Sequence, residues 1–356
     1  MVRIFSRYFA ARFLALFGGV LLVSILAVAS VEILLNLDDM LRSGDRASGA
    51  LRYLFLRIPS YYWNSLVPLA AATAGFLCMG LAGHRFEIVA TRAGGIPPAR
   101  LIGPVLLAAM GIAIFSLGID ETWIVDSHRG WAQQEEKNLR LRGDRLWYHH
   151  GRRIYRIGRP DLSNRKIYGV EIFELNPDGR LHQKTYADLA IIQSESGWRL
   201  QNVLAQKFDP SNPASLPKIE AMDEVQLKLA PNVDDILLAS NPSSLGISDL
   251  LDGIQRRSRD ANPEYILLTT LHQRLAQPVT IVLLALIGIA FGLRVERFRS
   301  FGLPAAGIVL TLGVFYGLRS ALSILGTGGV LPGSVIWLLL LAFAALAFLL
   351  LGRAPR

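Results

Sequence analysis

The side chains that could perform catalysis or bind a metal do not gather into a known pattern in this sequence. The chain has six histidines and one cysteine, and it lacks the motifs GxxxxGKS/T, HExxH, GxSxG and CxxC. His149 and His150 are adjacent, but a strand would point neighbouring side chains to opposite faces, so a shared metal is disfavoured. We therefore expect no catalytic, cofactor-binding or metal site in this chain.

A short polar segment, Ala82–Arg100, separates two long apolar segments. Its charged side chains are Arg85, Glu87, Arg92 and Arg100. The pattern predicts one short helix over 84–93, ended by Gly94-Gly95 and Pro97-Pro98. A plain turn between membrane helices needs almost no charge. We therefore interpret the segment as a helix that lies along the membrane and binds a second protein.

Two further points concern this short helix: an alternative interpretation of Glu87, and the faces on which its apolar side chains lie. Glu87 lies near the helix start, where a carboxylate suits the helix dipole, and it could simply be an exposed acid at that position. Helical spacing places Ile88 on one face with Arg85 and Arg92, whereas Phe86 and Val89 would lie against lipid or neighbouring helices.

The elements that must position this segment are apolar. The chain is 52% hydrophobic, and the apolar residues are clustered. A helix needs about 20 apolar residues to cross roughly 30 Å of hydrocarbon. At least six segments qualify, at about 9–35, 52–81, 101–119, 265–293, 301–325 and 334–352. The sequence thus predicts a polytopic α-helical membrane protein, with three spans before and three spans after a long polar interval.

Two charged residues lie within or beside these spans. Glu32 is near the outer end of the first span, where it either faces a polar partner or reaches headgroup water, and we favour water. Arg319 is well inside the fifth span, and an intramembrane arginine usually faces protein or a water-filled cavity.

The basic residues predict the orientation of the chain. The net charge is +9, but much of the excess flanks the spans, which disfavours nucleic-acid binding. On one side lie Arg3, Arg7, Arg12, Arg85, Arg92, Arg100, Arg294, Arg297, Arg299, Arg353 and Arg356. The positive-inside rule places both termini and the 82–100 segment in the cytoplasm. The polar interval 120–264 then lies outside.

The polar interval has the pattern of a β domain with flanking helices. Short runs typical of strands lie at 146–148, 153–157, 167–175, 181–192, 198–208 and 225–229. Asn176-Pro177-Asp178-Gly179 predicts a tight turn, and polar helices are predicted over 126–140 and 248–259. The strand spacing indicates a sandwich, barrel or jelly roll. The single cysteine, Cys78, excludes an intrachain disulfide.

Several motifs resemble the LptF/LptG (YjgP/YjgQ) family of lipopolysaccharide export permeases, over nearly the full length. The most specific is the run Glu87–Gly95, which resembles the family pattern E-L/I-x-x-x-R/Q/H-A-x-G. Supporting matches are Leu146-Trp147 with Ile154-Tyr155, then Gly169–Phe173, and Arg274–Pro278 at the start of the fourth span. The order of domain features resembles LptG more than LptF.

The resemblance implies one permease half of an ABC exporter in the inner membrane of Gram-negative bacteria. A paralogous permease, LptF if this chain is LptG-type, would form the other half, and a separate LptB dimer would bind and hydrolyse ATP. The pair would extract lipopolysaccharide and pass it to a periplasmic bridge that begins with LptC and leads to the outer membrane. The fold implied is TM1–TM3 over 1–119, a periplasmic β-jelly-roll domain over 120–264, and TM4–TM6 over 265–356.

The resemblance also implies candidate site residues. A coupling helix at about 84–95 would dock in the ATPase through Arg85, Glu87, Ile88, Thr91, Arg92 and Gly94. Candidates for the substrate path are Glu32, Arg42, Arg46, Arg274 and Arg319.

The sequence departs from the family pattern at two places. Phe86 stands where a small polar residue is frequent, and the basic residues Arg42 and Arg46 stand beside Asp38 and Asp39. The alternative function is a membrane-anchored periplasmic scaffold or adaptor for envelope assembly that does not transport. A transporter subunit would bind a soluble ATPase and a scaffold would not.

Overall fold

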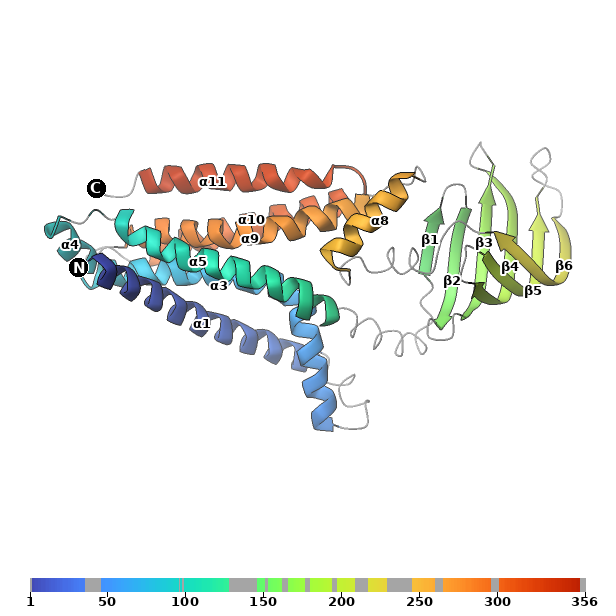
Figure 1. Cartoon of the computed structure of the whole chain (residues 1–356), viewed down its shortest axis with the longest axis horizontal. Helices are drawn as coiled ribbons and strands as arrows, with labels where there is room; N and C mark the ends of the chain where they lie inside the picture. The colour runs from blue at the N-terminus through green and yellow to red at the C-terminus, as the bar shows by residue number, and fades with distance from the viewer. Residues whose placement is uncertain are drawn as a thin grey trace. The chain divides into compact units, whose positions relative to one another are not determined.

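The computed structural model describes residues 2–35, 46–95, 97, 99–127, 146–150, 153–161, 166–176, 180–193, 197–208, 217–228, 245–259, 265–295 and 301–352. The chain forms two compact units. Unit 1 comprises Met1–Trp131 with Tyr265–Arg356, and unit 2 comprises Ala132–Glu264. Unit 1 is helical, and unit 2 contains a β-sheet (Figure 1).

Unit 1 contains six helices that are long and apolar enough to cross a membrane, counted among the described residues. They are α1 (Val2–Leu35), α3 (Arg46–His84), α5 (Ala99–Ile119), α9 (Tyr265–Gly292), α10 (Gly302–Thr327) and α11 (Ile336–Gly352). A 3-10 turn, Gly333–Val335, precedes α11. The prediction of six membrane helices is confirmed. The start of α1 and the end of α11 lie at the same end of the bundle (Figure 1).

Small residues bring α3 and α9 into close contact at the centre of the bundle. Ala71, Ala72 and Ala74 of α3 are fully buried. A Cβ added at Gly288 would overlap the carbonyl oxygen of Ala72, and one at Gly292 would lie 2.6 Å from that of Phe76. Backbone approach of this kind gives dispersion contact that larger residues would prevent.

Two membrane helices differ from the prediction, one in its continuity and the other in the residue at which it ends. Helix α3 is continuous over 39 residues although Pro59 and Pro68 lie inside it. Figure 1 shows its first part turned away from the rest, as expected of a helix that contains proline. The third span does not end at Ile119 but continues through a π-helical turn, Asp120–Ile124, to Ser127. The rest of the helix predicted over 126–140 lies outside the described residues.

Unit 2 contains a six-stranded antiparallel sheet. Its strands are β1 (Leu146–His150), β2 (Arg153–Asp161), β3 (Lys166–Leu175), β4 (Leu181–Gln193), β5 (Gly197–Lys207) and β6 (Lys218–Lys228). Helix α8 (Ile247–Arg259) follows in the chain. The inserted antiparallel β domain is confirmed. The described strands pair in chain order, as in a meander, whereas a jelly roll is built from Greek-key crossovers.

Alternation along the strands gives the sheet one apolar face. Buried residues stand opposite one another across the ladders, as Tyr155 does with Ile172 and Val170 with Ala187. The core of this unit consists of Tyr155, Ile167, Val170, Ile172, Ala187, Ala190, Trp198, Leu200 and Val203.

Strand β6 is longer than predicted, because it begins at Lys218 and not at Val225. Its first half mixes acidic and apolar residues and carries few β-branched ones, so the strand pattern is weak. Ion pairs of 2.8 Å from Lys207 to Glu220 and 2.9 Å from Arg199 to Glu224 link it to β5. The predicted 176–179 turn lies largely outside the described residues.

We predict that Gly288→Ala lowers the thermal stability of the purified chain in detergent. The added methyl group would overlap the Ala72 carbonyl oxygen, and overpacking of this kind costs about 1–3 kcal/mol. The matched control is Gly317→Ala, because a Cβ there meets no described atom within 4 Å. Alanine should instead stabilise that helix by roughly 0.5–1 kcal/mol. Equal effects at both positions would contradict the close packing of α3 and α9.

Candidate functional site

The polar segment between the second and third spans forms a separate short helix, α4 (Glu87–Ala93). The predicted helix over 84–93 is wrong at its start. Helix α3 continues to His84, and Arg85 and Phe86 form a turn in which Phe86 has φ 61°. A left-handed backbone at a bulky residue is uncommon and ends the helical path of α3. Gly94 and Gly95, with φ 75° at Gly95, end α4 as the glycine pair predicted.

One side of α4 is fixed to the bundle. Ile88 is 6% exposed and belongs to the same apolar cluster as Phe9 and Phe13 of α1. Thr91 is buried as well, and its hydroxyl donates to the Ile88 carbonyl oxygen at 2.9 Å. These two predicted docking residues therefore hold α4 in place and do not lie on its exposed side.

The opposite side of α4 is exposed and largely apolar. Phe86 is 39% exposed and Val89 is 56% exposed. The other exposed residues of this surface are Arg85, Ala90, Ala93 and Gly94. Of the predicted docking residues, Arg85 and Gly94 lie here, and Glu87 and Arg92 are half-buried at its margin. We call Arg85, Phe86, Val89, Ala90, Ala93 and Gly94 the exposed α4 surface.

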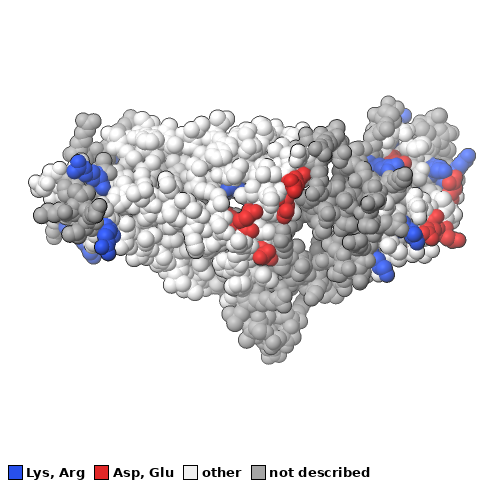
Figure 2. Space-filling model, in the orientation of Figure 1, with Lys and Arg blue, Asp and Glu red and all other residues white. Residues whose placement is uncertain are grey.

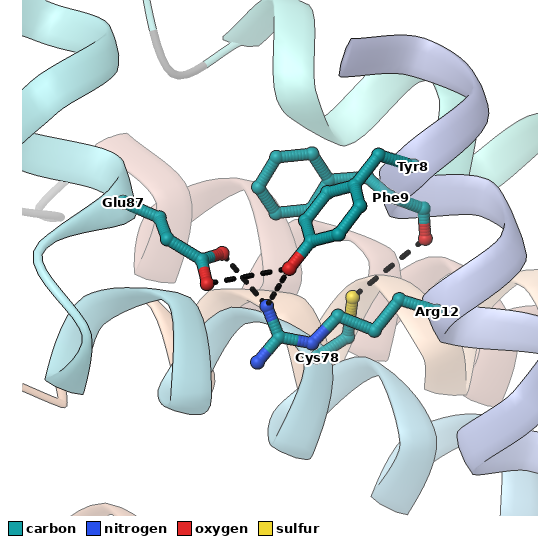
Figure 3. A network of polar contacts seen from close by, with 5 residues as sticks. All are labelled: Tyr8, Phe9, Arg12, Cys78 and Glu87. Atoms are coloured by element: carbon teal, nitrogen blue, oxygen red, sulfur yellow. Dashed lines mark hydrogen bonds and ion pairs between the residues drawn. The ribbon is translucent and has the colours of Figure 1, made fainter. Parts of the chain in front are cut away.

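Glu87 is held by α1 (Figure 3). Arg12 Nη1 donates to Glu87 Oε2 at 2.7 Å, and both side chains are mostly shielded from solvent. The Tyr8 hydroxyl donates to Glu87 Oε1 at 3.4 Å, and Arg12 Nη1 lies 3.5 Å from the same hydroxyl oxygen. Beside them the buried Cys78 thiol lies 3.9 Å from the Phe9 carbonyl oxygen, which places α3 against the same turn of α1.

The alternative interpretation of Glu87 as an exposed acid at the helix start is thus wrong, because its side chain is only 25% exposed and binds Arg12. Residues 75 positions apart form a charge-assisted hydrogen bond, which is shorter and stronger than a neutral one. Sequence analysis used Arg12 only to orient the chain. Its place inside the apolar stretch that starts at Phe9 was a usable signal, because a cation there needs a partner.

The interpretation that Glu32 reaches headgroup water is also wrong. Glu32 is 3% exposed and lies among side chains of α3. The hydroxyls of Tyr53 and Tyr62 donate to its carboxylate, and Arg57 Nε lies 3.5 Å from Oε1. The Arg57 guanidinium also lies 3.8 Å from the centre of the Tyr61 ring. This cluster joins the far end of α1 to α3.

The remaining predicted substrate-path residues are placed in part. Arg319 Nη2 donates to Gln277 Oε1 at 2.8 Å. Asp120 lies close enough to Arg274 and Arg319 to attract both electrostatically. Arg42 lies outside the described residues, and Arg46 is the first residue of α3. Glu32 belongs to the separate cluster on α1 and α3.

Charge and shape mark two further features of unit 1. Figure 2 shows Lys and Arg gathered at the end where α4 lies, beyond a broad uncharged middle. An apolar pocket of about 410 Å³ lies between α3 and α10, with Phe76, Leu312 and Tyr316 among its lining residues. Across the described part of the chain, no three His, Cys, Asp or Glu side chains are grouped to hold a metal ion.

Comparison with known proteins identifies one family. A profile described as "Lipopolysaccharide export system permease LptF/LptG" matches residues 7–353. The comparison with curated proteins found no match. The matched region includes α1 from residue 7 onward, the other five long apolar helices, α4 and the inserted sheet.

We predict that Arg12→Leu loosens α4 and speeds hydrogen exchange of its backbone amides about fivefold. The change removes a partly exposed charge-assisted hydrogen bond, for which about 1 kcal/mol is expected after allowance for solvent screening. The measurement is amide exchange by mass spectrometry on peptides covering 87–93. Arg7→Leu is the control, because Arg7 is an exposed cation on the same helix. Unchanged exchange in Arg12→Leu would show that the pair does not hold α4.

Proposed function

This chain belongs to the LptF/LptG family of lipopolysaccharide export permeases, and from that premise we propose that it is the LptG-type half of an ABC exporter. An LptF-type paralogue would complete the permease, an LptB dimer would supply ATP hydrolysis, and LptC would receive the lipid. The LptG assignment rests on the order of domain features in the sequence.

The exposed α4 surface is the observation that carries this proposal. It presents an aromatic ring, a valine and an arginine beside small residues, and aromatic residues and arginine are enriched at energetically important positions of interfaces. Its opposite side is bound to α1 and to the core, so a force applied to α4 would reach the membrane helices. A surface with these properties suits a coupling helix that docks in a groove of the ATPase. Glu87 and Arg92 would lie at the rim of that contact.

The charge distribution supports a cytoplasmic position for α4. Basic side chains gather at this end of unit 1, and the start of α1 and the end of α11 lie there too (Figures 1 and 2). Positive residues next to membrane spans stay on the cytoplasmic side. In this orientation unit 2 is periplasmic, as a bridge to the outer membrane requires.

The sheet of unit 2 has properties suited to a lipid bridge. Its apolar face is buried in the core of the unit, where the ring centres of Tyr155 and Trp198 lie 6.1 Å apart, and it would accept acyl chains if the sheet opened along one side. Each acyl CH₂ exposed to water costs about 0.8 kcal/mol, so a multi-acyl lipid must stay in apolar surroundings throughout. Strand β6 is an edge of the described sheet and exposes Ile219 and Met222, which suits pairing with a strand of LptC.

Arg319 and Arg274 are the cations that we propose for the substrate path. Both lie within membrane helices, where a charge is expensive and usually functional. A phosphate group of lipopolysaccharide is an acceptor that an arginine can bind through two hydrogen bonds. The apolar pocket between α3 and α10 would accommodate part of an acyl chain.

We predict that Val89→Asp lowers co-purification of the ATPase at least tenfold. A carboxylate at the centre of an apolar contact would be desolvated without a partner, and disruption of a central contact typically costs 2 kcal/mol or more, so roughly 2 kcal/mol is expected. Arg7→Asp introduces the same side chain on α1 and should retain the ATPase. Full retention of the ATPase by Val89→Asp would show that α4 is not the docking element.

We also predict that α4 and β6 are labelled from opposite sides of the membrane. A membrane-impermeant maleimide should modify Phe86→Cys only after the inner membrane is opened. The same reagent should modify Ile219→Cys, a residue that is 64% exposed in β6, in intact spheroplasts. The native Cys78 is buried and gives the background level. Labelling of Phe86→Cys in intact spheroplasts would invert the topology.

A further inference from the structure

Pro68 leaves one backbone carbonyl of α3 without its usual donor. In an α-helix the N–H of residue 68 would donate to the carbonyl oxygen of residue 64, but proline has no N–H. The structure fills this place with a side chain from another helix. Gln277 Nε2 of α9 donates to the Asn64 carbonyl oxygen at 2.7 Å, and Gln277 is 2% exposed.

The next carbonyl of α3 is used in the same way. The Tyr316 hydroxyl of α10 donates to the Ser65 carbonyl oxygen at 2.7 Å. Hydrocarbon supplies no hydrogen-bond donor, so a backbone carbonyl of a membrane helix that lacks its usual donor has to find one inside the protein. The opened turn before Pro68 is therefore a pair of acceptors that α9 and α10 bind with one side chain each.

The first of these bonds fixes how Gln277 is oriented. A glutamine amide has an NH₂ donor end and a carbonyl acceptor end. Since Nε2 faces the Asn64 carbonyl oxygen, Oε1 must face the other way, and there it accepts from Arg319 Nη2 at 2.8 Å. In the reversed amide, Oε1 would face the Asn64 carbonyl oxygen, and Nε2 would face the N–H groups of Arg319, so neither hydrogen bond could form. Pro68 thus determines, through Gln277, which group Arg319 meets.

This arrangement holds Arg319 without neutralising it. Gln277 is uncharged, so its hydrogen bond fixes the guanidinium and leaves the positive charge in place. Arg319 Nη1 is buried and has no hydrogen-bond partner among the described residues. The carboxylate that attracts Arg319, Asp120, is itself bound by Asn64: with the amide oriented by its surroundings, the nitrogen donates to both carboxylate oxygens at 3.1 and 3.2 Å.

We propose that Gln277 is a positioning residue that keeps Arg319 ready to bind a phosphate of the transported lipid, and that Pro68 is what orients Gln277. The inference rests on the proposed role of Arg319 in the substrate path. Without Gln277 the long arginine side chain regains its rotamer freedom and is free to pair with Asp120, which would cancel the charge that a phosphate needs. Arg319 lies eight residues from the end of α10, or about 12 Å inside the span.

The test compares binding of phosphorylated and dephosphorylated lipid A to the purified permease complex. Gln277→Ala should weaken binding of the phosphorylated form about tenfold or more, the effect expected from loss of one hydrogen bond to a charged group, and leave the dephosphorylated form unchanged. Pro68→Ala should do the same, because the restored N–H competes for the Asn64 carbonyl oxygen. The double variant should be no weaker than either single one.

A second proline provides the matched control. Pro104 also lies inside a membrane helix, and Pro104→Ala should bind both lipid forms as the unmodified complex does. If Gln277→Ala yields no folded complex, Pro68→Ala carries the test, since it leaves both Gln277 and Arg319 in place. Equal loss of both lipid forms in these variants would show a purely structural role and overturn the inference.

Arg319→Ala separates this inference from its premise. If that variant binds both lipid forms normally, Arg319 does not bind phosphate, and the proposed substrate path is wrong at this residue. If it loses the phosphorylated form while Gln277→Ala and Pro68→Ala do not, the substrate path stands and the positioning role is wrong.

Discussion

The constraint on which the helical unit depends is that hydrocarbon offers no hydrogen bonds. A charged side chain at the centre of a membrane helix costs about 2.5–3.5 kcal/mol on insertion scales, and an unpaired backbone group is also expensive. A polar group buried in the bundle is therefore stabilised where its own helix or another one supplies a hydrogen-bond partner. The positions of four polar residues therefore determine which helices are joined by hydrogen bonds: Glu32, Glu87, Gln277 and Arg319.

These polar contacts have a distribution that apolar packing alone would not give. Helix α1 is joined near its start through Arg12 to Glu87 of α4, and near its end through Glu32 to α3. Between these points Leu22, Val23 and Leu26 are more than half exposed within the chain. The helix is thus held by side chains at both ends and leaves its middle available to lipid or to a second permease.

Local properties of this chain could be predicted from its sequence, whereas contacts between residues far apart along the chain could not. Apolar length alone predicted six spans, and alternation predicted the positions of five strands closely. The predicted run for strand β6 was too short, because an edge strand that is exposed on both faces has no clear alternation of apolar and polar residues. The surroundings of Glu32 and Glu87 could not be predicted, because Tyr53 and Arg12 reach them only once the helices are packed. The turn at Phe86 was missed because nothing in its side chain favours a positive φ.

Two kinds of attachment in unit 1 would respond differently to a force on α4. Helices α3 and α9 touch backbone to backbone at Gly288 and Gly292, and such packed cores do not deform continuously, so the two helices would move as one body. Helix α1 has no comparable seam in its middle, since a Cβ at Gly18 or Gly19 would meet no described atom within 4 Å. Its link to α4 is one partly exposed ion pair, and its Phe9 and Phe13 share a large apolar cluster with Ile88 and with residues of α3, α5 and α9. A force on α4 would therefore reach α1 directly through the Glu87–Arg12 pair, and we infer that the α3–α9 pair stays intact when that force acts.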